Sequence, residues 1–116
     1  MTAFRILLAT IFLTIAVYTA IVVADHGLGL LPVFFGDMAA MGWAGQFNLD
    51  FMGMLALSAL WLAWRNEFSP FGIALGTLGF FGGAPVLTAY LFVTSFAVEG
   101  DVKALLLGRG RADGLA

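Results

Sequence analysis

The sequence predicts an all-α integral membrane protein with three transmembrane helices, at about residues 5–24, 46–64 and 71–97. Of its 116 residues, 62% are hydrophobic and 10% are charged, whereas ordinary soluble domains are about 25% charged. Nineteen uncharged residues follow Arg5 without interruption, and at about 1.5 Å per residue this run matches the roughly 30 Å hydrocarbon core of a bilayer. We therefore expect a single transmembrane domain over residues 1–116, whose core is the set of contacts between its helices.

The first predicted helix has to be distinguished from a secretory signal peptide. Val22 and Ala24 are small residues of the kind that precede a cleavage site, and Arg5 gives a short positive region before the apolar run. The run is longer than the roughly 7 to 15 residues that are usual for a signal peptide. We therefore expect residues 5–24 to remain as a helix.

The second apolar stretch reaches a spanning length only if it begins near residue 46. In that register Asn48 can cap the helix, and Asp50 then lies in the first turn, where the positive end of the helix dipole favours a carboxylate. The other end carries the aromatic and basic residues that are typical of a membrane interface, namely Trp61, Trp64 and Arg65. These features predict a helix over about 46–64.

The third stretch contains twenty-eight consecutive residues without a charge, which is long enough to span a bilayer with a tilt or a kink. Ser69 and Pro70 precede it as a capping residue and a first-turn proline. Pro85 lies inside it, shortly after two glycines, so we expect a bend at this point. Because neighbouring helices can satisfy the freed carbonyl, we predict one kinked helix over about 71–97 rather than two separate helices.

The chain between the first two predicted spans does not fit a spanning helix. Residues 27–45 contain five glycines and one proline among apolar residues. We predict an interfacial or re-entrant segment here, with Trp43 at the depth of the lipid headgroups. After the third span, residues 99–116 form a polar tail. Because the first helix usually dominates orientation, Arg5 favours an N-terminus on the inner side of the membrane.

A stripe of glycines is the most regular pattern in the chain. The glycines recur at i, i+4, i+7 and i+11 and so share one helical face; they are Gly72, Gly76, Gly79 and Gly83. Small residues at this spacing let another backbone approach closely enough for van der Waals packing to hold two helices together in lipid. We expect the first or second helix of the same chain to fill this groove, and an interface with another copy or another protein is the alternative.

Asp50 is the leading polar candidate, because an ionisable group at membrane depth is costly and usually faces a partner or a cavity. We expect it to have a structural role, and the alternative is that it handles protons, ions or a substrate. His26 and Asp37 are predicted on the same side of the membrane and complete this candidate polar site. We expect no metal site, because the spacing does not specify the convergent geometry that a metal requires.

The second predicted helix opens with an aspartate and an aromatic residue and closes on a tryptophan, an alanine and a basic–acidic pair. The residues concerned are Asp50, Phe51, Leu55, Trp61, Ala63, Arg65 and Glu67, followed later by Gly79, Tyr90 and the leucine-rich tail Leu105, Leu106, Leu107 and Gly108. This pattern, over about the last two thirds of the chain, loosely resembles a domain-of-unknown-function family of small multi-helix membrane proteins from bacteria and plants. The chain departs from that family in the long segment before residue 46 and in the cluster ending at Pro85. The resemblance implies a three- or four-helix membrane fold and no chemistry, with Asp50 as the position to test.

The sequence carries no catalytic signature, and it leaves cofactors open. With a net charge of −2 there is no reason to expect a nucleic-acid partner; we expect the lipid bilayer, together with a second copy or a larger membrane complex, in a bacterial inner membrane. The favoured interpretation is an accessory or assembly subunit that acts by helix packing and is not an enzyme. The alternative is an oligomeric transporter or membrane enzyme that handles protons or a lipid-like substrate through Asp50 and the side of the membrane that carries His26 and Asp37.

Overall fold

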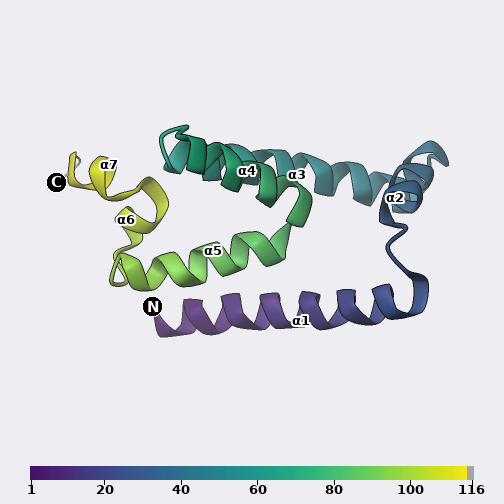
Figure 1. Ribbon diagram of the computed structural model, residues 1–116, viewed down its shortest axis with the longest axis horizontal. Helices are drawn as coiled ribbons and strands as arrows, with labels where there is room; N and C mark the ends of the chain where they lie inside the picture. Colours follow the sequence, from purple (N-terminus) through teal and green to yellow (C-terminus); the bar gives the residue numbers. More distant parts are fainter. Residues whose placement is uncertain (115–116) are drawn as a thin grey trace.

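The computed structural model describes residues 1–114, and over that range the chain forms seven helices joined by short turns (Figure 1). The helices are α1 (Thr2–His26), α2 (Leu30–Ala39), α3 (Trp43–Arg65), α4 (Pro70–Gly82), α5 (Ala84–Ala97), α6 (Val102–Leu107) and α7 (Arg109–Gly114). The molecule measures 50 × 26 × 24 Å, and α1 and α3 lie along its long direction. The fold is therefore an elongated arrangement of helices rather than a sphere around one centre.

Helices α1 and α3 are long and apolar enough to cross a membrane. Helix α1 extends the predicted segment 5–24 at both ends, and α3 begins at Trp43, three residues before the predicted start. With 25 and 23 residues they exceed the roughly 20 residues that a bilayer requires. Two of the three predicted spans thus have the helices expected of them.

The third predicted span, about 71–97, is not one kinked helix, and this prediction is wrong. The chain forms α4 and α5, which are separated at Gly83, and α5 runs back alongside α4 as the second arm of a hairpin (Figure 1). Gly83 has φ +67° and ψ −144°, a combination that side-chain-bearing residues avoid because the Cβ atom clashes with the backbone. The Gly83 carbonyl accepts the amides of Val86 and Leu87, and Pro85 has no amide to satisfy.

The two arms of this hairpin pack against different long helices. Helix α4 lies mainly along α3, and α5 lies mainly along α1, whereas the arms contact each other less extensively. At about 1.5 Å per residue, arms of 13 and 14 residues are roughly 20 Å long. Each arm is therefore too short to cross a bilayer alone, and a third span is not present in the described part of the chain.

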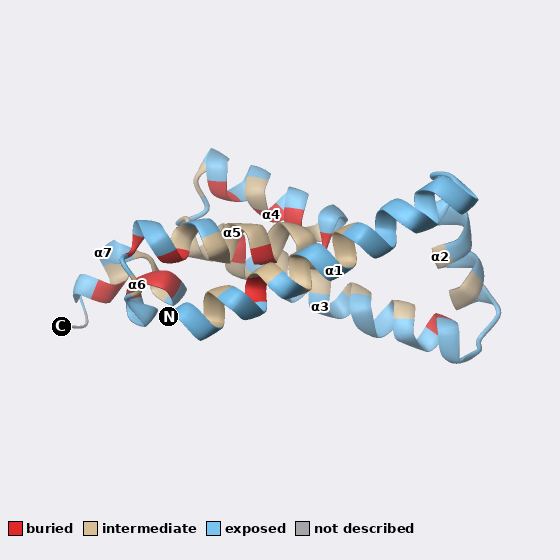
Figure 2. Cartoon of the chain, turned by 90° about the horizontal axis from the view of Figure 1, so that it is seen from below, coloured by how far each residue is buried: buried red, intermediate tan, exposed pale blue. Residues whose placement is uncertain are grey.

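Helix α2 and the start of α3 form the segment that was predicted over residues 27–45. In Figures 1 and 2, α2 runs crosswise to α1 and α3 at the end of the molecule far from the N-terminus. Gly45 is buried where α3 meets the backbone of Asp37 and Met38. The prediction that Asn48 caps α3 is wrong, because the helix begins five residues earlier, at Trp43. Instead, Asn48 Nδ2 donates to the carbonyl of Phe34 at 3.1 Å.

The predicted polar tail is folded over its described part, up to residue 114. Asp101 caps α6 by accepting the amides of Lys103 and Ala104. Four buried residues then form a small apolar cluster between the end of α5 and the two short helices, and they are Val98, Ala104, Leu105 and Ala112. This cluster lies beside the N-terminus of α1, so both ends of the described chain are at the same end of the molecule (Figure 1).

Candidate functional site

The glycine stripe forms the contact between α4 and α3. Gly72, Gly76 and Gly79 are all buried. A Cβ atom at Gly76 would lie 2.8 Å from the carbonyl oxygen of Ala59, and one at Gly72 would lie 3.2 Å from that of Ala63. These distances leave no room for a side chain, so the glycines allow two helix backbones to meet. The second long helix therefore occupies this groove from within the same chain.

Gly83, the fourth glycine of the predicted stripe, has a different place. It is buried at the tip of the hairpin, and a Cβ atom there would lie 3.3 Å from Phe51 Cζ and 3.5 Å from Leu55 Cδ2. The non-helical turn is thus covered by side chains of α3. Gly83 serves the change in chain direction and does not extend the helix-packing stripe.

Of the three predicted polar residues, Asp37 takes part in a hydrogen bond between side chains. Asp37, on α2, lies 3.5 Å from the Nδ2 of Asn48, which donates to it. His26 ends α1 and is exposed, and Asp50 is exposed on α3. Among residues 1–114, no group of three or more His, Cys, Asp or Glu side chains is placed to hold a metal ion.

A cluster of arginines at the opposite end forms the polar site that sequence reasoning missed. The guanidinium groups donate to the last backbone carbonyls of helices: Arg5 to Ser95 of α5, Arg109 to Ala97 of α5, and Arg111 to Trp64 of α3. The Ser95 and Trp64 carbonyls also accept the amides of Gly100 and Glu67 in the turns that follow their helices. The negative end of a helix dipole attracts a cation. Arg5 and Arg111 also stack on the rings of Phe96 and Trp64, at 3.7 and 4.0 Å from the ring centroids.

Arg65 is the centre of this arrangement. Its Nε donates to the Leu105 carbonyl at 2.6 Å and its Nη2 to the Ala104 carbonyl at 3.0 Å, so it closes the end of α6. Its Nη1 donates to Tyr90 Oη at 2.8 Å, and Asn66 Nδ2 donates to the same oxygen at 3.2 Å. One residue therefore joins the end of α3 to α5 and α6. The signal in the sequence was the Arg65–Asn66 pair, but its partners lie 24 to 40 positions further along the chain.

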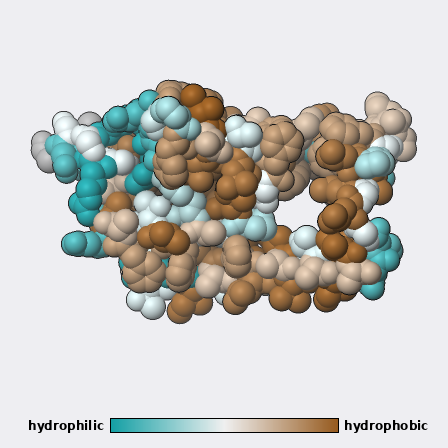
Figure 3. Space-filling model, viewed as in Figure 1, coloured by the Kyte–Doolittle hydropathy of each residue, from teal (hydrophilic) through white to brown (hydrophobic). Residues whose placement is uncertain are grey.

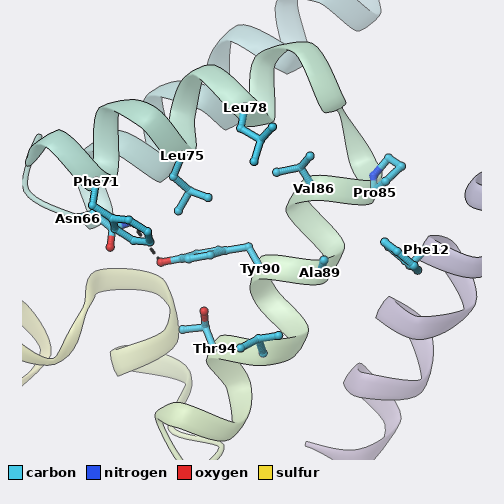
Figure 4. A pocket seen from close by; sticks show the side chains of 11 residues that line it. Phe12, Asn66, Phe71, Leu75, Leu78, Pro85, Val86, Ala89, Tyr90 and Thr94 are labelled. Carbon is cyan, nitrogen blue, oxygen red and sulfur yellow. Dashed lines mark hydrogen bonds between the residues drawn. The ribbon is translucent and has the colours of Figure 1, made fainter.

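A groove of about 680 Å³ lies between the two arms of the hairpin (Figure 4). Its walls are apolar over most of their length, with Leu75 and Leu78 on α4 facing Val86 and Ala89 on α5. The polar lining residues Asn66, Tyr90 and Thr94 lie at the end away from the hairpin tip (Figure 4). The groove thus has an apolar length and one polar end, which is the end next to Arg65.

A second feature is an opening between α1 and α3. The two helices diverge toward α2 in Figure 2, and the space-filling view shows a gap through the molecule near that end (Figure 3). Buried residues gather in the other half of the molecule (Figure 2), and residues 17–26 of α1 are all exposed. Large apolar side chains are among them, including Tyr18 at 72% and Ile21 at 57% exposure. The described chain does not fill the space between its two longest helices.

Comparison of the chain with known protein families, with curated proteins and with solved structures finds no match. The resemblance of about the last two thirds of the chain to a domain-of-unknown-function family stays a prediction. The features that bear on function are the glycine contact between α3 and α4, the arginine cluster, the groove between α4 and α5, and the opening between α1 and α3.

Proposed function

We propose that this protein is a small integral membrane protein that acts as an accessory or assembly subunit of a larger membrane complex. Helices α1 and α3 cross the bilayer, α2 lies at one interface, and the α4–α5 hairpin enters and leaves at the other. The protein works by helix packing, through the apolar faces that border the opening between α1 and α3. The observation that carries this proposal is that opening, since residues 17–26 of α1 are all exposed and a gap separates this part of α1 from α3.

The hairpin supports the membrane location. Backbone that leaves a helix at membrane depth is tolerated only where protein covers it, because lipid offers no hydrogen-bond partners. The Gly83 turn meets this requirement, since it is buried against Phe51 and Leu55 and its carbonyl accepts two amides. Exposed apolar side chains over most of α1 and α3 are also what contact with lipid or with other membrane helices requires.

The distribution of basic residues supports one orientation. All five Lys and Arg side chains of the chain belong to the end that carries the N-terminus, the α3–α4 turn and the short helices α6 and α7. Basic residues near spans face the cytoplasm. With a hairpin in place of a third span, the basic groups no longer divide between the two sides, and both termini face the cytoplasm of a bacterial inner membrane.

The partner helix is tested by cross-linking in the native membrane. The chain contains no cysteine, so single cysteines placed in turn at residues 17–24 of α1 and 47–54 of α3 each provide one unique attachment point. We expect cross-links into a different polypeptide at positions that recur every three to four residues, which is the spacing of one helix face. Single cysteines at Phe81 and Val93, which are 76% and 67% exposed on the hairpin, are the matched controls.

Native mass spectrometry of the protein, extracted in a mild detergent, identifies what remains bound. Recovery with a larger complex, together with periodic cross-links at the opening, supports the proposal. Recovery as a monomer with uniform, weak cross-linking would overturn it. A homo-oligomer that retains a small molecule would overturn it too, and would favour the transporter or enzyme alternative based on Asp50, His26 and Asp37.

A further inference from the structure

We propose that the groove between α4 and α5 binds one acyl chain of an anionic phospholipid, with the lipid phosphate at the polar end beside Tyr90 and Arg65. The inference rests on the membrane location proposed above, but it does not require a protein partner. It assigns a ligand to a site that the packing function does not use.

The dimensions of the groove fit a chain-like apolar ligand. Its volume of about 680 Å³ lies within the range of roughly 300 to 1,000 Å³ that is typical of ligand sites. Its lining runs from Phe71 to Leu78 on α4 and from Pro85 to Thr94 on α5, which at about 1.5 Å per residue is roughly 10 to 14 Å. The facing leucine and valine side chains leave an elongated apolar slot between the arms (Figure 4). Phe12 of α1 adds a wall that the hairpin itself does not supply.

The polar end presents hydrogen-bond donors. The Tyr90 oxygen accepts from Arg65 and from Asn66, which occupies both of its lone pairs. Its own hydrogen is therefore left to be donated, and in the hydrogen bonds among residues 1–114 the Tyr90 oxygen serves only as an acceptor. Arg65 uses three of the five N–H groups of a guanidinium. Thr94 lines the same end of the groove with a further hydroxyl group.

The guanidinium of Arg65 favours an anionic headgroup at this end of the groove. The end as a whole carries both signs of charge, since Glu67, Glu99, Asp101 and Asp113 lie on the same segments as the basic residues. The local charge is positive, because Nη1 of Arg65 lies 2.8 Å from the Tyr90 hydroxyl oxygen. A phosphate diester supplies oxygen acceptors for the Tyr90 and Thr94 hydroxyls and a negative charge for the arginines. In the proposed orientation this end faces the cytoplasmic leaflet, where anionic lipids and basic protein segments attract each other.

Native mass spectrometry tests the site on the full chain, exchanged into detergent that contains phosphatidylglycerol or phosphatidylcholine with identical acyl chains. We expect one tightly held phosphatidylglycerol and at least tenfold weaker retention of phosphatidylcholine. Leu78→Trp fills the groove and should abolish that retention. Leu49→Trp is the control, because Leu49 is exposed on α3 to nearly the same extent, 59% against 58% for Leu78, and does not line the groove.

Leu75→Trp is a second variant that fills the groove, and it provides the test if Leu78→Trp does not fold. The helix content of each variant is checked by circular dichroism. Equal retention of the two lipids, or unchanged retention in both filling variants, would overturn the proposed site. Inorganic phosphate is the probe for the headgroup alone, and retention of phosphate without lipid would also overturn it. If the proposed membrane location is wrong, the protein will be recovered in solution without detergent, which distinguishes that outcome from failure of the lipid site.

Discussion

Gly76 is the residue that shows most directly how this chain uses glycine. A Cβ atom there would meet a backbone carbonyl of α3 at 2.8 Å, and a backbone atom cannot move aside as the end of a side chain can. Gly79 differs, because its nearest neighbour is the terminal Cδ1 of Leu62, at 2.6 Å. Two glycines on the same face therefore tolerate substitution differently.

Gly76→Leu should separate α3 from α4. Overpacking of this kind costs about 1–3 kcal/mol, so we expect a lower midpoint of unfolding when helix content is followed during titration with denaturing detergent. Gly53→Leu is the matched control, because apart from the adjacent residues and the nearby backbone of α3 no atom lies within 4 Å of a Cβ at Gly53. Equal midpoints for the two variants would show that α3 and α4 do not pack through this face.

Arg65→Lys should release α6 from the end of α3. Lysine keeps the charge but lacks the planar set of donors that reaches three acceptors, and a hydrogen bond to a charged group contributes about 1.5–3 kcal/mol. We expect amide hydrogen exchange over residues 101–108 to rise by on the order of tenfold, since about 1.4 kcal/mol corresponds to a factor of ten. Lys103→Arg, at an exposed position of α6, should leave that exchange unchanged; an equal rise there would contradict the role of Arg65.

The α4–α5 hairpin is the element in which sequence and structure differ most. An uncharged run of this length is compatible with one spanning helix or with two arms, and hydropathy does not distinguish them. The decision depends on which neighbour each half packs against, α3 for α4 and α1 for α5. That choice is made by contacts between distant segments, so the proline and glycine cluster predicted a bend but not a reversal of direction.

Gly83→Ala should lower the stability of the protein if α4 and α5 form a hairpin and raise it if they form one continuous helix. At φ +67° and ψ −144° an alanine is strained, and such conformations cost about 1–3 kcal/mol. In a continuous helix the same change would stabilise by about 0.5–1 kcal/mol. We expect a lower unfolding midpoint for Gly83→Ala and a higher one for Gly53→Ala, measured side by side; a rise for both would contradict the hairpin.

The candidate sites were also predictable to different degrees, depending on whether their residues are close together in the sequence. Three glycines of the stripe were found because helical spacing is local in sequence. The polar site at Arg65 and Tyr90 was missed, since residues 25 positions apart meet only once α5 has turned back. Asp50, which drew attention through the cost of burying a charge, is exposed on α3. The half-buried hydrogen bonds of Arg65, Asn66 and Tyr90 lie at the other end of the molecule.

At the scale of the whole molecule, the number of membrane crossings has a direct test. With two spans and a hairpin, both termini lie on one side, whereas three spans would place them on opposite sides. We expect green fluorescent protein fused to either terminus to be fluorescent in the cytoplasm, and alkaline phosphatase inserted between Gly27 and Gly29 to be active in the periplasm. Active alkaline phosphatase at the C-terminus would contradict the proposed topology.

The collection of every basic side chain at one end also bears on how the protein is made. In the proposed topology the end of α1 and residues 27–42 have to be moved across the bilayer, and they carry two acidic residues, Asp25 and Asp37, beside His26 but no Lys or Arg. The hairpin arms enter lipid without carrying any charge through it, because residues 71–98 contain none. Insertion therefore needs the transfer of one short segment without Lys or Arg, and everything after Arg65 is assembled from the side on which it is synthesised.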